Sequence, residues 1–142
     1  MALTLPSRKV LTLEAAKRIV AAAEETARKG GWRVVIAVVD EGGHALCVHR
    51  LDGTQSSSVE TAVGKARTAM AFKRPTRVLE DIVNQGRFAF LGVGGGATLM
   101  QGGLPIEIEG EFVGAVGVSG VKASDDEIIA QSGIDALRRD LA

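Results

Sequence analysis

The feature that most constrains the fold is a strand, a tight turn and a second strand in the first half of the chain. Residues 32–40, WRVVIAVVD, form a short apolar run rich in β-branched residues, which favours a buried strand over a helix. Two glycines follow within residues 41–43, EGG, and residues 44–51 are predicted to form the returning strand, which Asp52 and Gly53 end. Because a hairpin pairs its strands antiparallel, the pattern favours an α+β fold over a doubly wound parallel sheet.

A second hairpin is predicted from residue 104 onward, in the segment LPIEIEGEFVGAVGVSG. Its apolar residues alternate on either side of a turn that we place at Gly110-Glu111. The preceding segment, residues 88–103, is rich in glycine and weakly periodic, and is predicted to be a loop with one short strand. Together these segments predict an antiparallel sheet of about five strands.

Four segments have apolar residues at spacings of three and four, which predicts helices that cover this sheet: residues 12–29, 58–73, 77–85 and 125–142. Capping residues are expected at each start: Thr12, the pair Ser57 and Glu60 as a capping box, Thr76, and Ser124. Glycine or proline is expected to end the first three: Gly30 with Gly31, Pro75, and Gly86. The sequence therefore predicts one α+β domain over residues 1–142.

Composition excludes several classes of function. The chain has 17 basic and 17 acidic residues and no tyrosine, so neither a basic field nor a stacking platform for nucleic acid is expected. Its single cysteine, Cys47, excludes an internal disulfide and is predicted to be a buried, inert thiol. No apolar run is long enough to span a membrane and no secretory signal precedes the domain, so we expect a cytoplasmic protein without a membrane partner.

The glycine-rich segment GVGGGATLMQGG does not match a nucleotide-binding loop. It lacks the Lys-Ser/Thr pair of a Walker loop, and a strand rather than a helix is predicted to follow it. Gly102 and Gly103 would instead allow the backbone to approach a ligand or another strand closely. We expect Gly53 and Gly103 to lie beside a pocket, where a bulky replacement would harm ligand binding before stability.

Both histidines lie in the first hairpin. His44 and His49 are five residues apart, so on a regular strand they point to opposite faces and cannot share one metal ion unless a β-bulge lies between them. His44, next to the turn, is the preferred candidate for a metal ligand or an acid/base, because the ends of hairpins line clefts.

A set of charged residues is predicted to meet where the returning strand runs into the second helix: Arg50, Asp52, Glu60, Lys65 and Arg67. Cations accompanied by a few carboxylates suit a small anionic ligand or the propionates of a porphyrin. In particular, Arg50 and Arg67 are expected to form a cationic rim around one pocket. The alternative is an ordinary solvated helix face.

Several motifs resemble those of the GlcG/HbpS (heme-binding-protein-like) family, which includes the C-terminal domain of PduO-type corrinoid adenosyltransferases. They are VVDEGGHALCVHRLDG, SVETAVGKARTA, FKRPT, LMQGGLPIEIEGEFVGAVGVSG and DDEIIAQSGIDAL, and the resemblance as a whole extends over about residues 8–140 in the expected order. The resemblance implies a profilin-like α+β fold, assembly into homo-oligomers, and in several members heme binding. Some heme-binding members use a histidine in the first helix. Residues 12–29 contain none, so ligation would come from His44, His49, a methionine, a threonine or a partner subunit.

Three functions remain open at this point. We prefer an accessory or sensor module that binds a small ligand, with heme or a related tetrapyrrole as the cofactor that the resemblance implies. The second is a lyase, isomerase or hydrolase acting on a small carboxylic or hydroxy acid, with Glu60 or His44 as acid/base and arginine or lysine holding the carboxylate. The third is a structural subunit whose alanine-rich helix faces contact other subunits.

Overall fold

The computed structural model describes residues 1–142 and contains one four-stranded antiparallel sheet. The strands are β1 (Val35–Asp40), β2 (Ala45–Arg50), β3 (Gly103–Ile108) and β4 (Glu111–Ser119), in the order β2-β1-β4-β3. The predicted α+β class and both hairpins are confirmed, but the expected sheet of about five strands is wrong by one. Residues 88–92 form a short 3₁₀ helix, η1 (Phe88–Gly92), and the glycines that follow adopt turns, with positive φ at Gly95 and Gly96.

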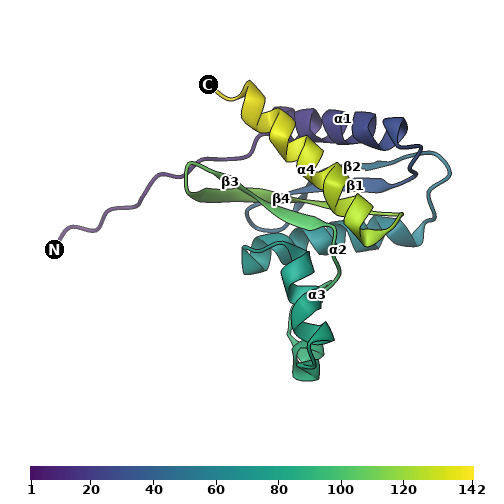
Figure 1. Cartoon of the computed structure of the whole chain (residues 1–142). Coiled ribbons are helices and arrows are strands. Elements are labelled where there is room, and N and C mark those ends of the chain that lie inside the picture. Colours follow the sequence, from purple (N-terminus) through teal and green to yellow (C-terminus); the bar gives the residue numbers. More distant parts are fainter.

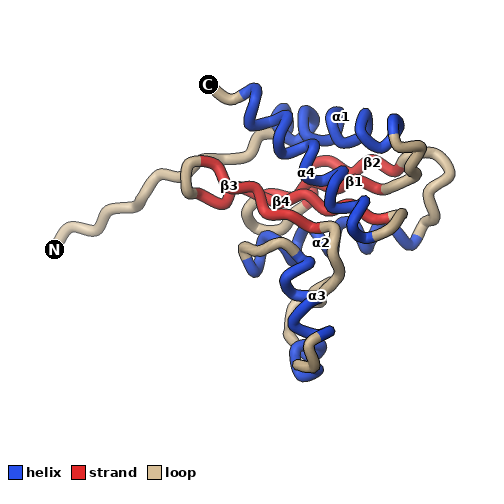
Figure 2. Tube along the Cα trace, viewed as in Figure 1, coloured by secondary structure: helices blue, strands red, loops and turns tan.

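Helices cover both faces of the sheet. Figure 1 shows α1 (Leu13–Lys29) and α4 (Ala123–Asp140) on one face and α2 (Ser57–Phe72) on the other, whereas α3 (Thr76–Asn84) projects from the body together with η1. The tube in Figure 2 shows the same two-sided arrangement around the strands. None of the four α-helices combines the length and the apolar character needed to cross a lipid bilayer.

The predicted helix caps are confirmed only at the first helix. Thr12 accepts a hydrogen bond from the Ala15 N–H at 3.1 Å, as expected of an N-cap side chain. At α2 and α4 the predicted caps are wrong, because Ser56 and Lys122 occupy the N-cap positions and neither makes a side-chain capping bond. Thr76 is the first residue of α3, and Pro75 precedes it at the N-cap.

The turn between β3 and β4 lies one residue earlier than predicted. Glu109 and Gly110 form it, with φ of 49° and 82° respectively. Positive φ at both central residues is the geometry of the two-residue turn that matches the twist of antiparallel strands.

The alanine-rich helix faces are buried inside this one domain. Ala16, Ala23 and Ala27 of α1 pack into the main core between the sheet and α4. On the opposite face, α2 lies so close to the sheet that a Cβ atom at Gly117 of β4 would be 2.0 Å from the Ala62 carbonyl oxygen. These faces are therefore unavailable for contacts between subunits, which removes the basis of the structural-subunit hypothesis.

An irregular register in the first hairpin shapes β2. Val38 pairs with Cys47 and Val39 with Ala45, so Leu46 is the extra residue of a β-bulge. Leu46 and Cys47 both pack partly against the main core as a result. Cys47 is only partly buried, so the predicted full burial is wrong, but this partial burial raises the pKa of the thiol and disfavours the reactive thiolate.

Candidate functional site

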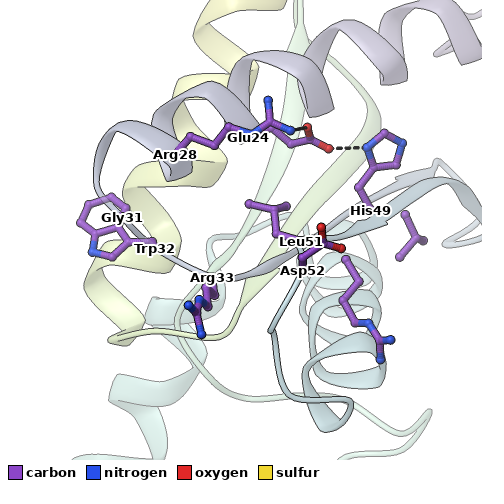
Figure 3. Close-up of a pocket in the computed structure, with 10 residues that line it drawn as sticks. Glu24, Arg28, Gly31, Trp32, Arg33, His49, Leu51 and Asp52 are labelled. Carbon is purple, nitrogen blue, oxygen red and sulfur yellow. Dashed lines mark hydrogen bonds and ion pairs between the residues drawn. The ribbon is translucent and has the colours of Figure 1, made fainter.

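A hollow of about 610 Å³ lies between the C-terminal part of α1 and the end of β2 (Figure 3). We call it the α1–β2 hollow. Its volume is within the range of small-molecule sites, roughly 300–1,000 Å³. After α1 ends at Lys29, Gly31 adopts a φ of 67° and turns the chain toward β1. The Trp32 indole packs closely on this turn: a Cβ atom at Gly30 would be only 2.7 Å from the ring.

A carboxylate–histidine pair is the central feature of the α1–β2 hollow. Glu24 of α1 pairs through Oε1 with His49 Nδ1 and through Oε2 with the Arg28 guanidinium at 3.0 Å, and Figure 3 shows it between these two side chains. Because an ionised carboxylate can only accept, it favours the imidazole tautomer that carries its proton on Nδ1. The Nε2 lone pair of the neutral ring is then free for a metal ion or a proton. Such a carboxylate is also the usual second partner of a metal-ligating histidine.

Cations and apolar side chains line the rest of the α1–β2 hollow. Arg33 and Arg50 contribute guanidinium groups and Asp52 a carboxylate, and none of the three forms an ion pair within the chain. Trp32 and Leu51 provide apolar surface, with Leu51 lying between the indole and the carboxylate–histidine pair in Figure 3. The arrangement can hold a flat, partly apolar anion with an imidazole at one end.

The five charged residues predicted to meet are distributed over three places. Arg50 and Asp52 line the α1–β2 hollow, whereas Glu60 and Arg67 line a separate hollow on α2. The rim expected between Arg50 and Arg67 is therefore not formed. Arg67 lies against Gly43 at the start of the hairpin, and Arg50 is at the far end of β2, roughly 20 Å away along the strand.

Lys65 lies in the interior and does not face either hollow. Its side chain is 2% exposed, and its ammonium donates to the Val118 carbonyl oxygen at 2.9 Å and to the Asp126 carboxylate at 3.1 Å. The Asp126 carboxylate also accepts the Val121 N–H at 3.2 Å. Burial raises the pKa of Asp126, against the lowering effects of Lys65 and of this N–H group. Lys65 of α2 thus joins this helix to β4 through Val118 and to α4 through Asp126.

The glycines predicted to border a pocket have different surroundings. Gly102 and Gly103 are buried against Lys65: a Cβ atom would be 2.8 Å from its Nζ at the first and 2.4 Å from its carbonyl oxygen at the second. Gly53 is exposed, has a φ of 84° and lies beside the Arg33 side chain near the end of the α1–β2 hollow. Of the two positions expected beside a pocket, only Gly53 is near one of the two hollows.

The two histidines are not on one regular strand, because His44 precedes β2 and the β-bulge at Leu46 lies between them; the better placed one is His49. His44 is exposed before the start of β2, and its backbone N–H donates to Asp40 Oδ1 at 3.0 Å. No three histidine, cysteine or acidic side chains gather to hold a metal ion. His49 therefore replaces His44 as the histidine to consider for ligation.

Sequence reasoning missed the charged and aromatic residues that α1 and the segment after it contribute to the α1–β2 hollow: Glu24, Arg28, Trp32 and Arg33. The spacing of Glu24 and Arg28 by four residues on one helix was an available signal for their ion pair. Alternation places His49 on the same side of β2 as Cys47, two residues before it. Which helix covers that side is not encoded in any local pattern.

Comparisons with known proteins give one consistent result. The family described as "Haem degrading protein HbpS-like" matches residues 11–135. Protein GlcG of Escherichia coli K12 is 39% identical over 115 residues, covering 81% of this chain and 85% of that protein.

Two solved structures match over nearly the whole chain. A double mutant of Streptomyces reticuli HbpS has a TM-score of 0.85 at 35% identity, covering 96% of this chain and 95% of that one. A PduOC–heme complex has a TM-score of 0.83 at 30% identity, covering 90% of this chain and 95% of that one.

Proposed function

Because this chain belongs to the HbpS-like family, we propose that it is a heme-binding accessory or sensor module. The observation that carries the proposal is the likeness to a PduOC domain whose structure is a heme complex, at 30% identity over 90% of this chain. We place the heme in the α1–β2 hollow, because the residues gathered there have the chemistry that heme requires.

The residues of the α1–β2 hollow fit heme in three respects. The porphyrin provides four nitrogen ligands to iron, so a single imidazole is enough and a cluster of protein ligands is unnecessary. His49 supplies that imidazole, with Glu24 holding Nδ1. Arg33 and Arg50, which have no ion-pair partner in the chain, match the two propionates, and Trp32 offers the macrocycle an apolar contact.

Bound heme would supply iron for redox sensing or oxygen chemistry. The chain's own contribution is to orient the ligand: Glu24 fixes the imidazole, and the arginines fix the carboxylate edge. A related tetrapyrrole with the same propionates would use the same arginines. The α1–β2 hollow is open to solvent, so a single protomer covers the ligand only in part.

Titration with hemin tests the proposal. We expect the intact chain to shift the Soret band saturably at stoichiometric hemin, and His49→Ala to weaken binding at least about tenfold and to change the position of the band. The matched control is His44→Ala, because His44 is the only other histidine and lies outside the α1–β2 hollow. Equal spectra and affinities for the two variants would remove His49 as ligand, and the lack of any Soret shift would overturn heme binding.

The enzyme alternative has no specific observation in its favour. His44 is exposed at the hairpin turn and Glu60 lies on the outer face of α2, so neither of the two alternative acid/base residues lies in the α1–β2 hollow. Reaction on a small carboxylic acid is therefore not proposed.

A further inference from the structure

A second hollow, of about 440 Å³, lies on the face of α2 that points away from the sheet. We call it the α2 hollow. The residues that α2 buries against the sheet include Ala62, Ala66 and Ala69, and Glu60 and Arg67 lie on the opposite side of the same helix. Because α1 covers the other face of the sheet, the α2 hollow is separate from the site proposed for heme.

The wall of the α2 hollow is fixed in place. The backbone N–H of Thr98 donates to Thr68 Oγ1 at 2.8 Å, and Thr68 is itself buried. The Thr98 hydroxyl lies directly on the helix at Gly64, where a Cβ atom would be 2.2 Å from Oγ1. Only glycine permits this approach, so the chain keeps the glycine-rich segment against α2 without help from a ligand.

Two opposite charges in the α2 hollow lack partners. Glu60 and Arg67 are exposed, and they form no ion pair with each other or with any other side chain. They are two helical turns apart, which separates their Cα atoms by about 10 Å. The Arg67 stem is held against the first hairpin, since a Cβ atom at Gly43 would be 3.0 Å from its Cγ. Val63 lies between the two charges on the same side of the helix.

We propose that the α2 hollow binds a small amphoteric molecule, an amino carboxylate with an aliphatic body. Arg67 would hold the carboxylate with its planar guanidinium, Glu60 would hold the ammonium, and Val63 would contact the aliphatic chain. A ligand with a single charge would pair with only one of the two side chains and leave the other solvated. Only a ligand with both charges, spaced by several carbons, satisfies both ends of the α2 hollow.

A set of three probes tests the proposed ligand class. In titrations followed by amide chemical shifts, 6-aminohexanoate should bind saturably and shift residues of α2 and residues 96–98. Hexanoate and hexylamine each lack one charge and should bind at least about tenfold more weakly. If 6-aminohexanoate does not saturate, or if hexanoate binds as tightly, the proposal is overturned.

Paired variants assign the two ends of the ligand. Glu60→Gln should bind 6-aminohexanoate about tenfold more weakly and should no longer distinguish it from hexanoate, whereas Arg67→Gln should weaken both carboxylates. Arg74→Gln is the matched control, since Arg74 is also exposed and unpaired but lies outside the α2 hollow, and it should bind as the intact chain does. Wild-type affinity in Glu60→Gln or Arg67→Gln would contradict the assignment. The hemin titration should be unaffected in all three variants.

Discussion

At the scale of single residues, Lys65 is the largest of the fully buried side chains. A lone buried ammonium would be very costly, and three contacts offset that cost: the Val118 carbonyl oxygen, the Asp126 carboxylate and, through that carboxylate, the Val121 N–H. The helix motif that contains Lys65 therefore has a structural role in fixing α4 to the far side of the sheet.

We expect Lys65→Met to destabilise the protein by about 3–5 kcal/mol, because it leaves the Asp126 carboxylate buried without its cation. The double variant Lys65→Met/Asp126→Asn removes that charge and keeps an acceptor for the Val121 N–H. Urea unfolding should therefore show the double variant to be more stable than the single one. Equal stability of the two would mean that the ion pair contributes nothing beyond packing.

Gly103 provides a second test at the scale of single residues. From the sequence, a bulky replacement was expected to harm ligand binding before stability, whereas the structure predicts that it harms stability first. A Cβ atom would lie 2.4 Å from the Lys65 carbonyl oxygen, so a side chain must push β3 away from α2. We expect Gly103→Val to lower the free energy of unfolding by about 1–3 kcal/mol or more, while hemin affinity per folded molecule is unchanged. Gly94→Ala is the control, since a Cβ atom added there would have no neighbour within 4 Å.

Substitutions at Arg50 distinguish the effect of its positive charge from that of its planar guanidinium geometry in the proposed heme site. Loss of a charge-assisted hydrogen bond costs about 1.5–3 kcal/mol, so Arg50→Ala should weaken hemin binding roughly ten- to a hundredfold. Arg50→Lys should recover only part of this loss, because an ammonium cannot hold a carboxylate bidentately. Full recovery by lysine would indicate a diffuse electrostatic effect, and the same variants should leave binding in the α2 hollow unchanged.

At the scale of secondary-structure elements, Thr76 fixes the base of the projecting α3. Its hydroxyl accepts the Gly103 N–H at 2.9 Å and thereby joins the first residue of α3 to the first residue of β3. We expect Thr76→Val, which has nearly the same shape, to cost about 1–3 kcal/mol because a buried N–H loses its partner. Thr76→Ser should retain most of the stability in thermal unfolding. If valine and serine behave alike, the hydrogen bond has no net effect.

Most helices and strands could be predicted from the sequence, because the residues that start, end and orient them lie within or next to them. The cap at Thr12, the glycines after α1 and the alternation in both hairpins act within a few residues of where they occur. The short fifth strand predicted within residues 88–103 is not formed, because glycines in this segment turn the chain rather than extend it.

The candidate site was harder to predict because it depends on tertiary packing. Glu24 and His49 are 25 residues apart and meet only because α1 covers the β2 side that carries His49. The predicted meeting of Arg50 and Arg67 failed for the same reason, since Arg67 packs against Gly43 at the hairpin turn and Arg50 is at the opposite end of β2. Contacts within one element can be predicted from spacing, whereas contacts between faces require the fold.

At the scale of the whole molecule, apolar surface remains outside the core. The alanine-rich faces are buried, but Phe88 and Leu91 of η1 are 69% and 64% exposed, and Met100, shortly before β3, is 48% exposed. Leu3 and Leu5, in the extended N-terminal segment, are also exposed. Phe88 and Leu91 are three residues apart on η1, which places them on one side of the 3₁₀ helix and offers apolar area that another protein can cover.

We therefore expect a homo-oligomer that is held by the segment around η1 rather than by the helix faces proposed from the sequence. Light scattering at micromolar concentration should give at least a dimer mass, and Phe88→Ser/Leu91→Ser should lower it, because each substitution removes apolar area from the contact. Leu141→Ser is the control, since Leu141 is 46% exposed at the other end of the chain. A monomeric mass for the intact chain would contradict assembly, and an unchanged mass for the double variant would place the contact elsewhere. If the second copy also covers the open side of the α1–β2 hollow, the double variant should bind hemin more weakly although every residue of that hollow is intact.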